Sequence, residues 1–409
     1  MIVTSEGVVA DKIREDAEKI QIVMQYLESR GLMKTLAQME EETGSMYISS
    51  LLGEGGVLDT LVDARTRATG TPSVEESVSL PIPGECATRV ACIKQGIHGS
   101  TNPTSVAWVQ SSDMSILTGG VDGKIHQWKW DGEDGLIQES HTLTVPSPVL
   151  FLDTSVDGHV AAACMGGEVC LFSNRNEITA VNVSRPHGVN RVTCALFSPN
   201  GKMLATFGRD IAVSVMALSD SGEWAEVSGV TIRYEREISS ICWIAEDTIA
   251  VAETGNCMVG LHKISDGKKT LIGELCMNKS TRDPRSNYSM LAMAWHDELR
   301  LLAGCTSRNS AILFQLPKTI DEKKAICPIK TYYGMSLGVY DFPSIMFSVD
   351  GSFLYVTSDK EIIVFETKTC HKVFSISGSE SKPVRCVSRH RPSDTLATVS
   401  FDKSLYVIS

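Results

Sequence analysis

The longer part of the chain, from about residue 86 to the end, shows short runs in which hydrophobic and polar residues alternate. A stretch such as "SILTGGVDGKIHQW" (115–128) holds two runs of strand length around a turn that contains Gly and Asp. A period of two residues is that of a half-buried β-strand, and Gly and Asp favour turns. This part of the chain is therefore predicted to be mainly β, with many short antiparallel strands.

The first 46 residues follow a helical period instead. Apolar residues recur every three or four positions between Ile13 and Leu27, which predicts a helix that ends at Gly31. A second short stripe runs from Leu32 to Met39 and stops before Gly44. Two helices of this length cannot form a core alone, so their apolar faces must pack on another surface.

One structural unit repeats seven times in the β-rich part. Each repeat has an apolar strand, a turn that ends in Asp or a substitute for it, and a second alternating strand. The turn markers stand at positions 122, 166, 210, 255, 308, 359 and 402, with spacings of 44, 44, 45, 53, 51 and 43 residues. A period of this size fits four short strands with their turns, and such sheets bury both faces by stacking around an axis.

The two ends of the repeat array complement one another. The last repeat stops at Ser409 after its third strand, and an unassigned alternating run at 87–95 precedes the first repeat. We expect this run to pair with the last repeat, because that pairing closes the ring and covers an open sheet edge. The predicted organisation is a helical motif at 1–46, a short helix and linker at 47–85, and a seven-bladed propeller at 86–409.

The repeats resemble the WD40 family, although the Trp-Asp dipeptide is missing and Trp128 is followed by Lys129. The resemblance implies a buried structural hydrogen-bond network in several blades. A His/Thr/Asp set can also form a nucleophilic triad, but its repetition favours the structural role, because buried polar groups need partners. The implied network residues are His98, Thr118, Asp122 and Trp128 in the first blade, His187, Thr206 and Asp210 in the third, and Thr398 and Asp402 in the seventh.

The N-terminal helical pair resembles the LisH motif over about residues 18–44. The matching residues include Tyr26-Leu27, Gly31-Leu32 and Met39, and Leu32 stands where an aromatic residue is common. LisH motifs are dimerisation devices, so the resemblance implies a homodimer. The alternative is a helical hairpin that docks on its own propeller. The implied dimerisation residues are Ile20, Val23, Leu27, Leu32, Leu36 and Met39.

Charge and composition exclude several classes of function. The net charge is −11, of which residues 1–85 carry −8 and residues 86–409 carry −3. An acidic head on a near-neutral body disfavours nucleic-acid and membrane-surface binding. The 12 cysteines form no CxxC pair, and no secretory signal is visible, which predicts an intracellular protein of the cytoplasm, the nucleus or both. Phosphate-binding loops, hydrolase motifs and metal-ligand spacings are missing, so we expect no enzyme activity, cofactor or metal.

The WD40 resemblance implies a non-enzymatic scaffold that docks partner proteins on the open face of the propeller. In that family the docking positions flank the first residue of each inner strand and precede the turn Asp. Arginine and aromatic residues dominate interface energies, and arginine suits an acidic partner segment. The implied partner-binding residues are Arg191, Thr193 and Arg209 in the third blade, Glu237 and Ser239 in the fourth, and Arg385 and Phe401 in the seventh.

Three cellular roles fit a LisH–WD40 scaffold. The first is a substrate receptor in a ubiquitin-ligase assembly, and the second is a subunit of a nuclear transcription or splicing complex. The third is a regulator of dynein or microtubules, which is weakened by the lack of a long heptad run between head and propeller. The sequence does not separate the first two.

Overall fold

The computed structural model of the chain describes residues 23, 24, 27, 32–43, 90–109, 114–132, 137–173, 179–219, 222–265, 267–278, 288–320, 325–337, 343–377 and 382–409. The chain divides into two compact units, residues 1–79 and residues 80–409. Each unit is described by itself.

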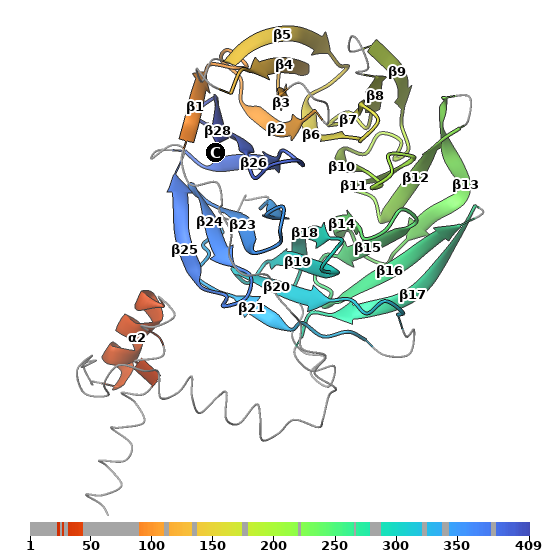
Figure 1. Cartoon of the computed structure of the whole chain (residues 1–409). Helices are drawn as coiled ribbons and strands as arrows, with labels where there is room; N and C mark the ends of the chain where they lie inside the picture. The colour runs from red at the N-terminus through yellow and green to blue at the C-terminus, as the bar shows by residue number, and fades with distance from the viewer. Residues whose placement is uncertain are drawn as a thin grey trace, which may run out of the picture. The chain divides into compact units, whose positions relative to one another are not determined.

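The second unit is a ring of seven antiparallel sheets around a central axis (Figure 1), each with four strands among the described residues. The first four blades follow one another along the chain. Their strands are β2 (Pro103–Trp108), β3 (Ser115–Gly120), β4 (Lys124–Trp130) and β5 (Ile137–Thr144), then β6 (Val149–Thr154), β7 (His159–Cys164), β8 (Val169–Ser173) and β9 (Thr179–Ser184), then β10 (Val192–Phe197), β11 (Met203–Gly208), β12 (Ala212–Leu218) and β13 (Trp224–Arg233), then β14 (Ile238–Trp243), β15 (Thr248–Glu253), β16 (Met258–Ser265) and β17 (Lys268–Cys276).

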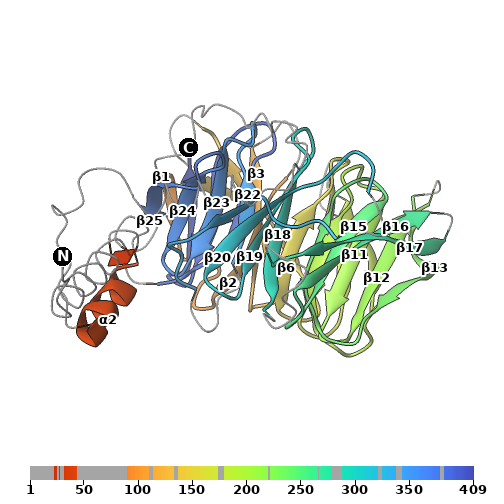
Figure 2. The same ribbon diagram turned by 90° about the horizontal axis from the view of Figure 1, so that it is seen from below.

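The fifth and sixth blades follow the same order from the inner to the outer strand. Figure 2 shows the strands of successive blades side by side from the edge of the ring. The strands of these two blades are β18 (Met290–His296), β19 (Leu301–Thr306), β20 (Ser310–Gln315) and β21 (Lys330–Tyr332), then β22 (Ile345–Phe347), β23 (Phe353–Ser358), β24 (Glu361–Glu366) and β25 (Lys372–Ser377).

The seventh blade combines the two ends of the propeller. Its inner three strands are β26 (Val384–Arg389), β27 (Leu396–Ser400) and β28 (Ser404–Ile408), and its outer strand is β1 (Val90–Gln95). β1 runs antiparallel to β28, with Val90 opposite Ile408 and Gln95 opposite Ser404. This pairing gives the last blade its fourth strand and covers the edge of β28.

The hydrophobic core is divided among the interfaces between blades. Seven clusters of buried side chains are found in the described residues, and each one joins two neighbouring blades. One cluster contains Leu117 and Ile125 of the first blade with Val149 and Val160 of the second. Another joins Val399 of the seventh blade to the first. The ring thus buries both faces of every sheet, and the prediction of a mainly β, seven-bladed propeller is confirmed.

The first unit contains the short helix α2 (Met33–Thr43). Val23, Met24 and Leu27 are also helical, and the N–H of Leu32 donates to the carbonyl of Leu27 at 2.9 Å. A bond from a residue to the carbonyl five positions earlier is typical of a helix end closed by a glycine motif. The side chain of Met24 is buried.

Most described side chains of the predicted dimerisation motif are only half-buried. Leu36 of α2 is buried, whereas Val23, Leu27, Leu32 and Met39 are half-buried. The motif residues Ile20, Tyr26 and Gly31 lie outside the described residues. No helix in the described ranges is both long and apolar enough to cross a membrane.

The closing pair β1–β28 leads to a prediction about truncation. Deleting residues 1–96 removes β1 and leaves the backbone donors and acceptors of β28 exposed, so we expect aggregated protein. Deleting residues 1–84 retains β1 and should yield a soluble, monomeric propeller. Size-exclusion chromatography with light scattering distinguishes the two products. Equal solubility of both truncations would show that the propeller does not need the closing strand.

Candidate interaction site

The inner strands share an irregularity at the mouth of the central channel. In six blades the pairing between the inner strand and its neighbour shifts at the second residue of the inner strand, as between Val192 and Cys194. A shift of this kind is a β-bulge, which leaves one residue outside the ladder and re-aims its side chain. These residues are Thr104, Leu150, Thr193, Ser239, Leu291 and Arg385, and all of them line the channel.

A second repeated feature, found in six blades, holds the turn between the two middle strands against the start of the inner strand. In the third blade the N–H of Arg209 donates to the carbonyl of Arg191 at 3.1 Å. The corresponding donors and acceptors are Val121 and Asn102, Met165 and Pro148, Thr254 and Glu237, Ser307 and Ser289, and Phe401 and Pro383, at 2.8 to 3.1 Å. These six pairs of residues form what we call the rim. Because the bond uses only backbone atoms, it leaves the choice of side chain open.

The structure brings most of the sequence-predicted partner-binding residues to one place. Arg191, Thr193, Ser239 and Arg385 line a central cavity of about 460 Å³. The other predicted residues belong to the rim: the Arg209 Nε lies 3.6 Å from the Glu237 carboxylate in the next blade, and Phe401 is the turn residue of the seventh blade. The Nε of Arg191 is buried and has no hydrogen-bond partner among the described residues.

Sequence reasoning missed an apolar part of the same face. Val121 and Met165 occupy the turn position that Arg209 and Phe401 occupy in their blades, and they are 48% and 55% exposed. Val189, in the connection between β9 and β10, is 83% exposed. Val121 and Met165 stand one position before the repeat markers at 122 and 166, as Arg209 stands before the marker at 210. The same positional rule, applied to every blade, would have identified them.

The rim therefore has two different halves. From the seventh blade to the third, its turn residues are Phe401, Val121, Met165 and Arg209. Arg385 of the seventh blade and Arg191 of the third line the cavity. In the fourth and fifth blades, and at the equivalent place in the sixth, the residues are polar or acidic: Glu237, Thr254, Ser289, Ser307, Ser344 and Thr357. We call the first half the apolar–basic arc.

The far end of the channel also carries charge. Arg389 and Arg391, at the end of β26 and just beyond it, line the cavity with Asp153 of β6. The carboxylate of Asp153 accepts the N–H of Phe197 at 2.8 Å, and burial raises its pKa, against the opposing effect of Arg391. The described lining thus contains four arginines and one aspartate, so the channel favours anionic groups.

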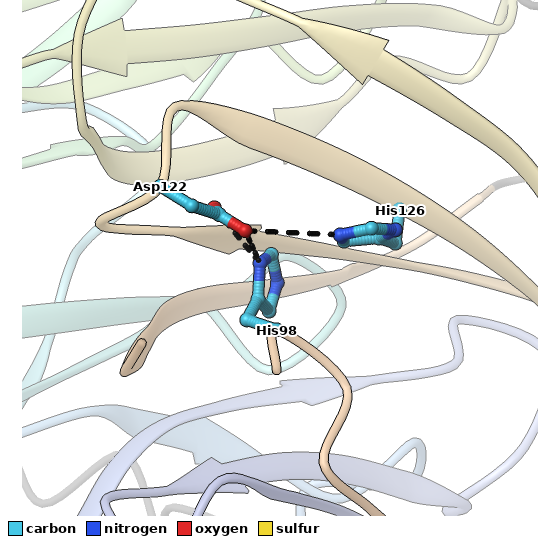
Figure 3. A group of neighbouring side chains, drawn as sticks. All are labelled: His98, Asp122 and His126. Atoms are coloured by element: carbon cyan, nitrogen blue, oxygen red, sulfur yellow. Dashed lines mark hydrogen bonds and ion pairs between the residues drawn. The ribbon is translucent and has the colours of Figure 1, made fainter. Parts of the chain in front are cut away.

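Below the rim, the first blade contains a buried hydrogen-bond network. The Nδ1 of His98 lies 3.0 Å from Asp122 (Figure 3). The Nε2 of His98 lies 3.0 Å from the Thr118 hydroxyl, and the Trp128 Nε1–H donates to the same hydroxyl at 2.9 Å. Asp122 also accepts the N–H of Lys124 at 3.1 Å. Burial lowers the pKa of His98 below its usual 6.5, against the opposing effect of Asp122. Every member has a partner, so the arrangement ties the turn to the blade.

Other blades use variants of this network. In the third blade His187 lies 2.9 Å from Asp210 and 3.0 Å from Thr206, and Met216 stands where the first blade has Trp128. In the seventh blade Thr398 donates to the Cys386 carbonyl and Asp402 accepts from Tyr406, without a histidine. The His/Thr/Asp sets that resemble a catalytic triad thus form hydrogen bonds within their blades, and Thr118 and Thr206 are buried.

Two blades hold the turn with a glutamate that sequence reasoning missed. In the second blade the carboxylate of Glu168 accepts from Ser147 at 2.8 Å and pairs with Arg185. In the fourth blade Glu253 accepts the N–H groups of Glu235 and Arg236, both at 3.1 Å. The repeat markers at 166 and 255 are glycines, so the neighbouring glutamate was the available signal.

The networks of the first and third blades predict unequal costs for the same substitution. Thr118→Val leaves two buried ring nitrogens without partners, the Nε2 of His98 and the Nε1 of Trp128. Thr206→Val leaves one such nitrogen, the Nε2 of His187, and removes a long bond of 3.5 Å to the Ser214 carbonyl. Each such group costs about 1–3 kcal/mol. We therefore expect Thr118→Val to lower the free energy of unfolding by about 1 kcal/mol more than Thr206→Val. Urea titrations measure both values, and equal losses would contradict the role assigned to Trp128.

Comparison with known proteins supports the assignment of the repeat. Residues 91–129 match the family model described as WD domain, G-beta repeat. The match runs from β1 to β4, so it includes the outer strand of the seventh blade and three strands of the first. No curated protein matches the chain. The protein is therefore a seven-bladed β-propeller that carries a WD40 repeat.

Proposed function

We propose that the protein is a non-enzymatic interaction scaffold that docks a segment of a partner protein across the apolar–basic arc of the rim. The observation that carries this proposal is the backbone bond repeated in six blades, which presents the turn side chains around the mouth of the channel. A rigid ring that holds variable side chains in fixed places is suited to recognition.

The side chains of the arc indicate the chemistry of the partner segment. Val121 and Met165 are exposed apolar groups that gain from burial, with Phe401 on one side of them and Arg209 on the other. Arg191 and Arg385 lie in the channel mouth, where a carboxylate can accept a pair of parallel N–H bonds. A short segment with apolar residues in its centre and acidic residues at its ends fits this pattern.

The complex that contains the scaffold is a separate question. Ubiquitin-ligase assemblies, nuclear transcription or splicing complexes and the dynein system are the three candidates. Proximity labelling in cells with mass spectrometry identifies which of these sets of proteins surrounds the chain. A cluster of ligase subunits, for example, would favour the substrate-receptor role.

The head supports the proposal that the scaffold is a homodimer formed through a LisH motif. Half-buried apolar residues lie on the helical segments of the head, among them Leu27, Leu32 and Met39. A helix of 11 residues such as α2 is marginal in water, so it depends on packing. Pairing of two heads would bury these side chains and bring two propellers together.

Charge reversal in the third blade tests the docking site. Arg191→Glu with Arg209→Glu replaces two attractive charges by two repulsive ones, so we expect partner capture to be lost in pull-downs from cells. The ion pair between Arg209 and Glu237 is exposed, and such pairs contribute little to stability, so the melting temperature should change little.

A matched control makes the same charge change away from the rim. Lys202→Glu with Lys263→Glu alters two exposed lysines away from the rim, one just before β11 and one near the end of β16. The variant also breaks an exposed ion pair, that of Lys263 with Asp247 at 3.3 Å. This variant should capture partners as the wild type does. If the rim variant is folded and still captures the same partners, the docking site lies elsewhere.

Substitutions on the half-buried stripe test dimerisation. Leu27→Asp with Met39→Asp should convert a dimeric full-length chain to a monomer, because an unpaired charge in an apolar interface costs several kcal/mol. These two positions are preferable to Leu36, which is buried. Light scattering at micromolar concentration measures the mass, and a monomeric wild type would exclude the homodimer.

A further inference from the structure

His126 lies in the first blade but takes no part in the hydrogen-bond network of His98, Thr118, Asp122 and Trp128. It lies on β4, four residues after the turn aspartate, and it is 9% exposed. Its Nε2 is buried without a hydrogen-bond partner among the described residues, and it faces the Asp122 carboxylate at 4.0 Å (Figure 3). The His98 ring stands edge-on to it, with centroids 4.6 Å apart. Two imidazoles and one carboxylate therefore converge.

Other blades show that the network forms without this histidine. In the third blade Ser214 stands four residues after Asp210, and the bonds of His187 to Asp210 and Thr206 are still made. In the seventh blade the same position is Tyr406, whose hydroxyl donates to Asp402. The side chain at this position thus reaches the turn aspartate, and in the first blade it presents a ring nitrogen instead of a hydroxyl.

The surroundings of His126 orient it as a ligand. Its Nδ1 lies 2.6 Å from the Glu139 carboxylate and 3.0 Å from the Thr142 hydroxyl. A carboxylate that accepts the Nδ1–H leaves the lone pair on Nε2, and this carboxylate–histidine arrangement is the usual support of a metal-bound imidazole. The other histidine has a matching support, because Thr118 can accept the Nε2–H of His98.

We propose that His98 Nδ1, Asp122 and His126 Nε2 bind a divalent ion of the zinc type. The three ligand atoms lie within 4.8 Å of one another, and tetrahedral coordination separates such atoms by about 3.3 Å. A shift of the His126 ring by up to about 1.5 Å closes the widest of these separations. Binding moves the proton of His98 from Nδ1 to Nε2, where Thr118 accepts it.

Charge and access agree with a bound cation. The carboxylates of Asp122 and Glu139 supply two negative charges beside two imidazoles, which a divalent ion neutralises. The Asp122 side chain is 18% exposed, so water can reach a fourth coordination position. His98 lies three residues after the closing strand β1, whereas Asp122 and His126 belong to the first blade. The ion would therefore link the closure of the ring to its first blade.

The test compares zinc binding by the full-length wild type with binding by His126→Ser, which reproduces the arrangement of the third blade and keeps its network. Isothermal titration with Zn²⁺ should show one more equivalent per chain for the wild type than for the variant. Co²⁺ should give the absorption bands of tetrahedral coordination in the wild type alone. Zn²⁺ should also raise the melting temperature of the wild type and not that of the variant. Equal zinc binding by both proteins would overturn the proposal.

Two further variants make the test independent of a loss of folding. Ser214→His builds the same cluster in the third blade, where Glu226 and Thr231 take the strand positions of Glu139 and Thr142, so it should add one equivalent of zinc. Glu139→Gln should weaken binding by about 10- to 100-fold, since it removes only the support of His126. A folded Ser214→His protein with no added equivalent, or an unchanged affinity of Glu139→Gln, would contradict the assigned geometry.

Discussion

The pairing of β1 with β28 is the interaction on which the rest of the propeller depends. In six of the described sheets the four strands follow one another along the chain. The seventh joins the first strand of the propeller to its last three strands. The carbonyl of Lys403, in the turn before β28, also accepts the N–H groups of Gly96 and Ile97, which follow β1. The closure thus positions His98 for the network of the first blade. Sheet closure, blade packing and the buried polar network are linked through this short stretch.

The candidate interaction site also follows from the architecture of the blades. Each blade must attach its turn to the start of the inner strand, and six blades do so with a backbone bond. Because that bond makes no demand on the side chain, the turn residue can be arginine, methionine, valine or phenylalanine at little cost to the fold. The arrangement explains how a uniform ring presents a rim with an apolar–basic half and a polar half.

The buried polar groups of the blades need hydrogen-bond partners, but these partners differ in residue type from blade to blade. Histidine, threonine and aspartate meet it in the first and third blades, and Glu168 and Glu253 meet it in the second and fourth. What the blades share is an acceptor that satisfies the donors of the turn and of the connection before it. A residue beyond this requirement, such as His126, is therefore informative, because the fold alone does not account for it.

The sequence by itself determined the strands, the seven repeats and the positions of the turns, since alternation and turn chemistry are local properties of the chain. It also placed Arg191, Thr193 and Arg385 at the starts of inner strands through a family pattern. Only the tertiary structure decided that Val121 and Met165 share a rim with them, and that Glu168 replaces the turn aspartate. The ring nitrogens of His98 and His126 likewise meet at Asp122 only in the folded blade. Such contacts join residues of different strands or blades, and the packing of the ring, which no short stretch of sequence contains, brings them together.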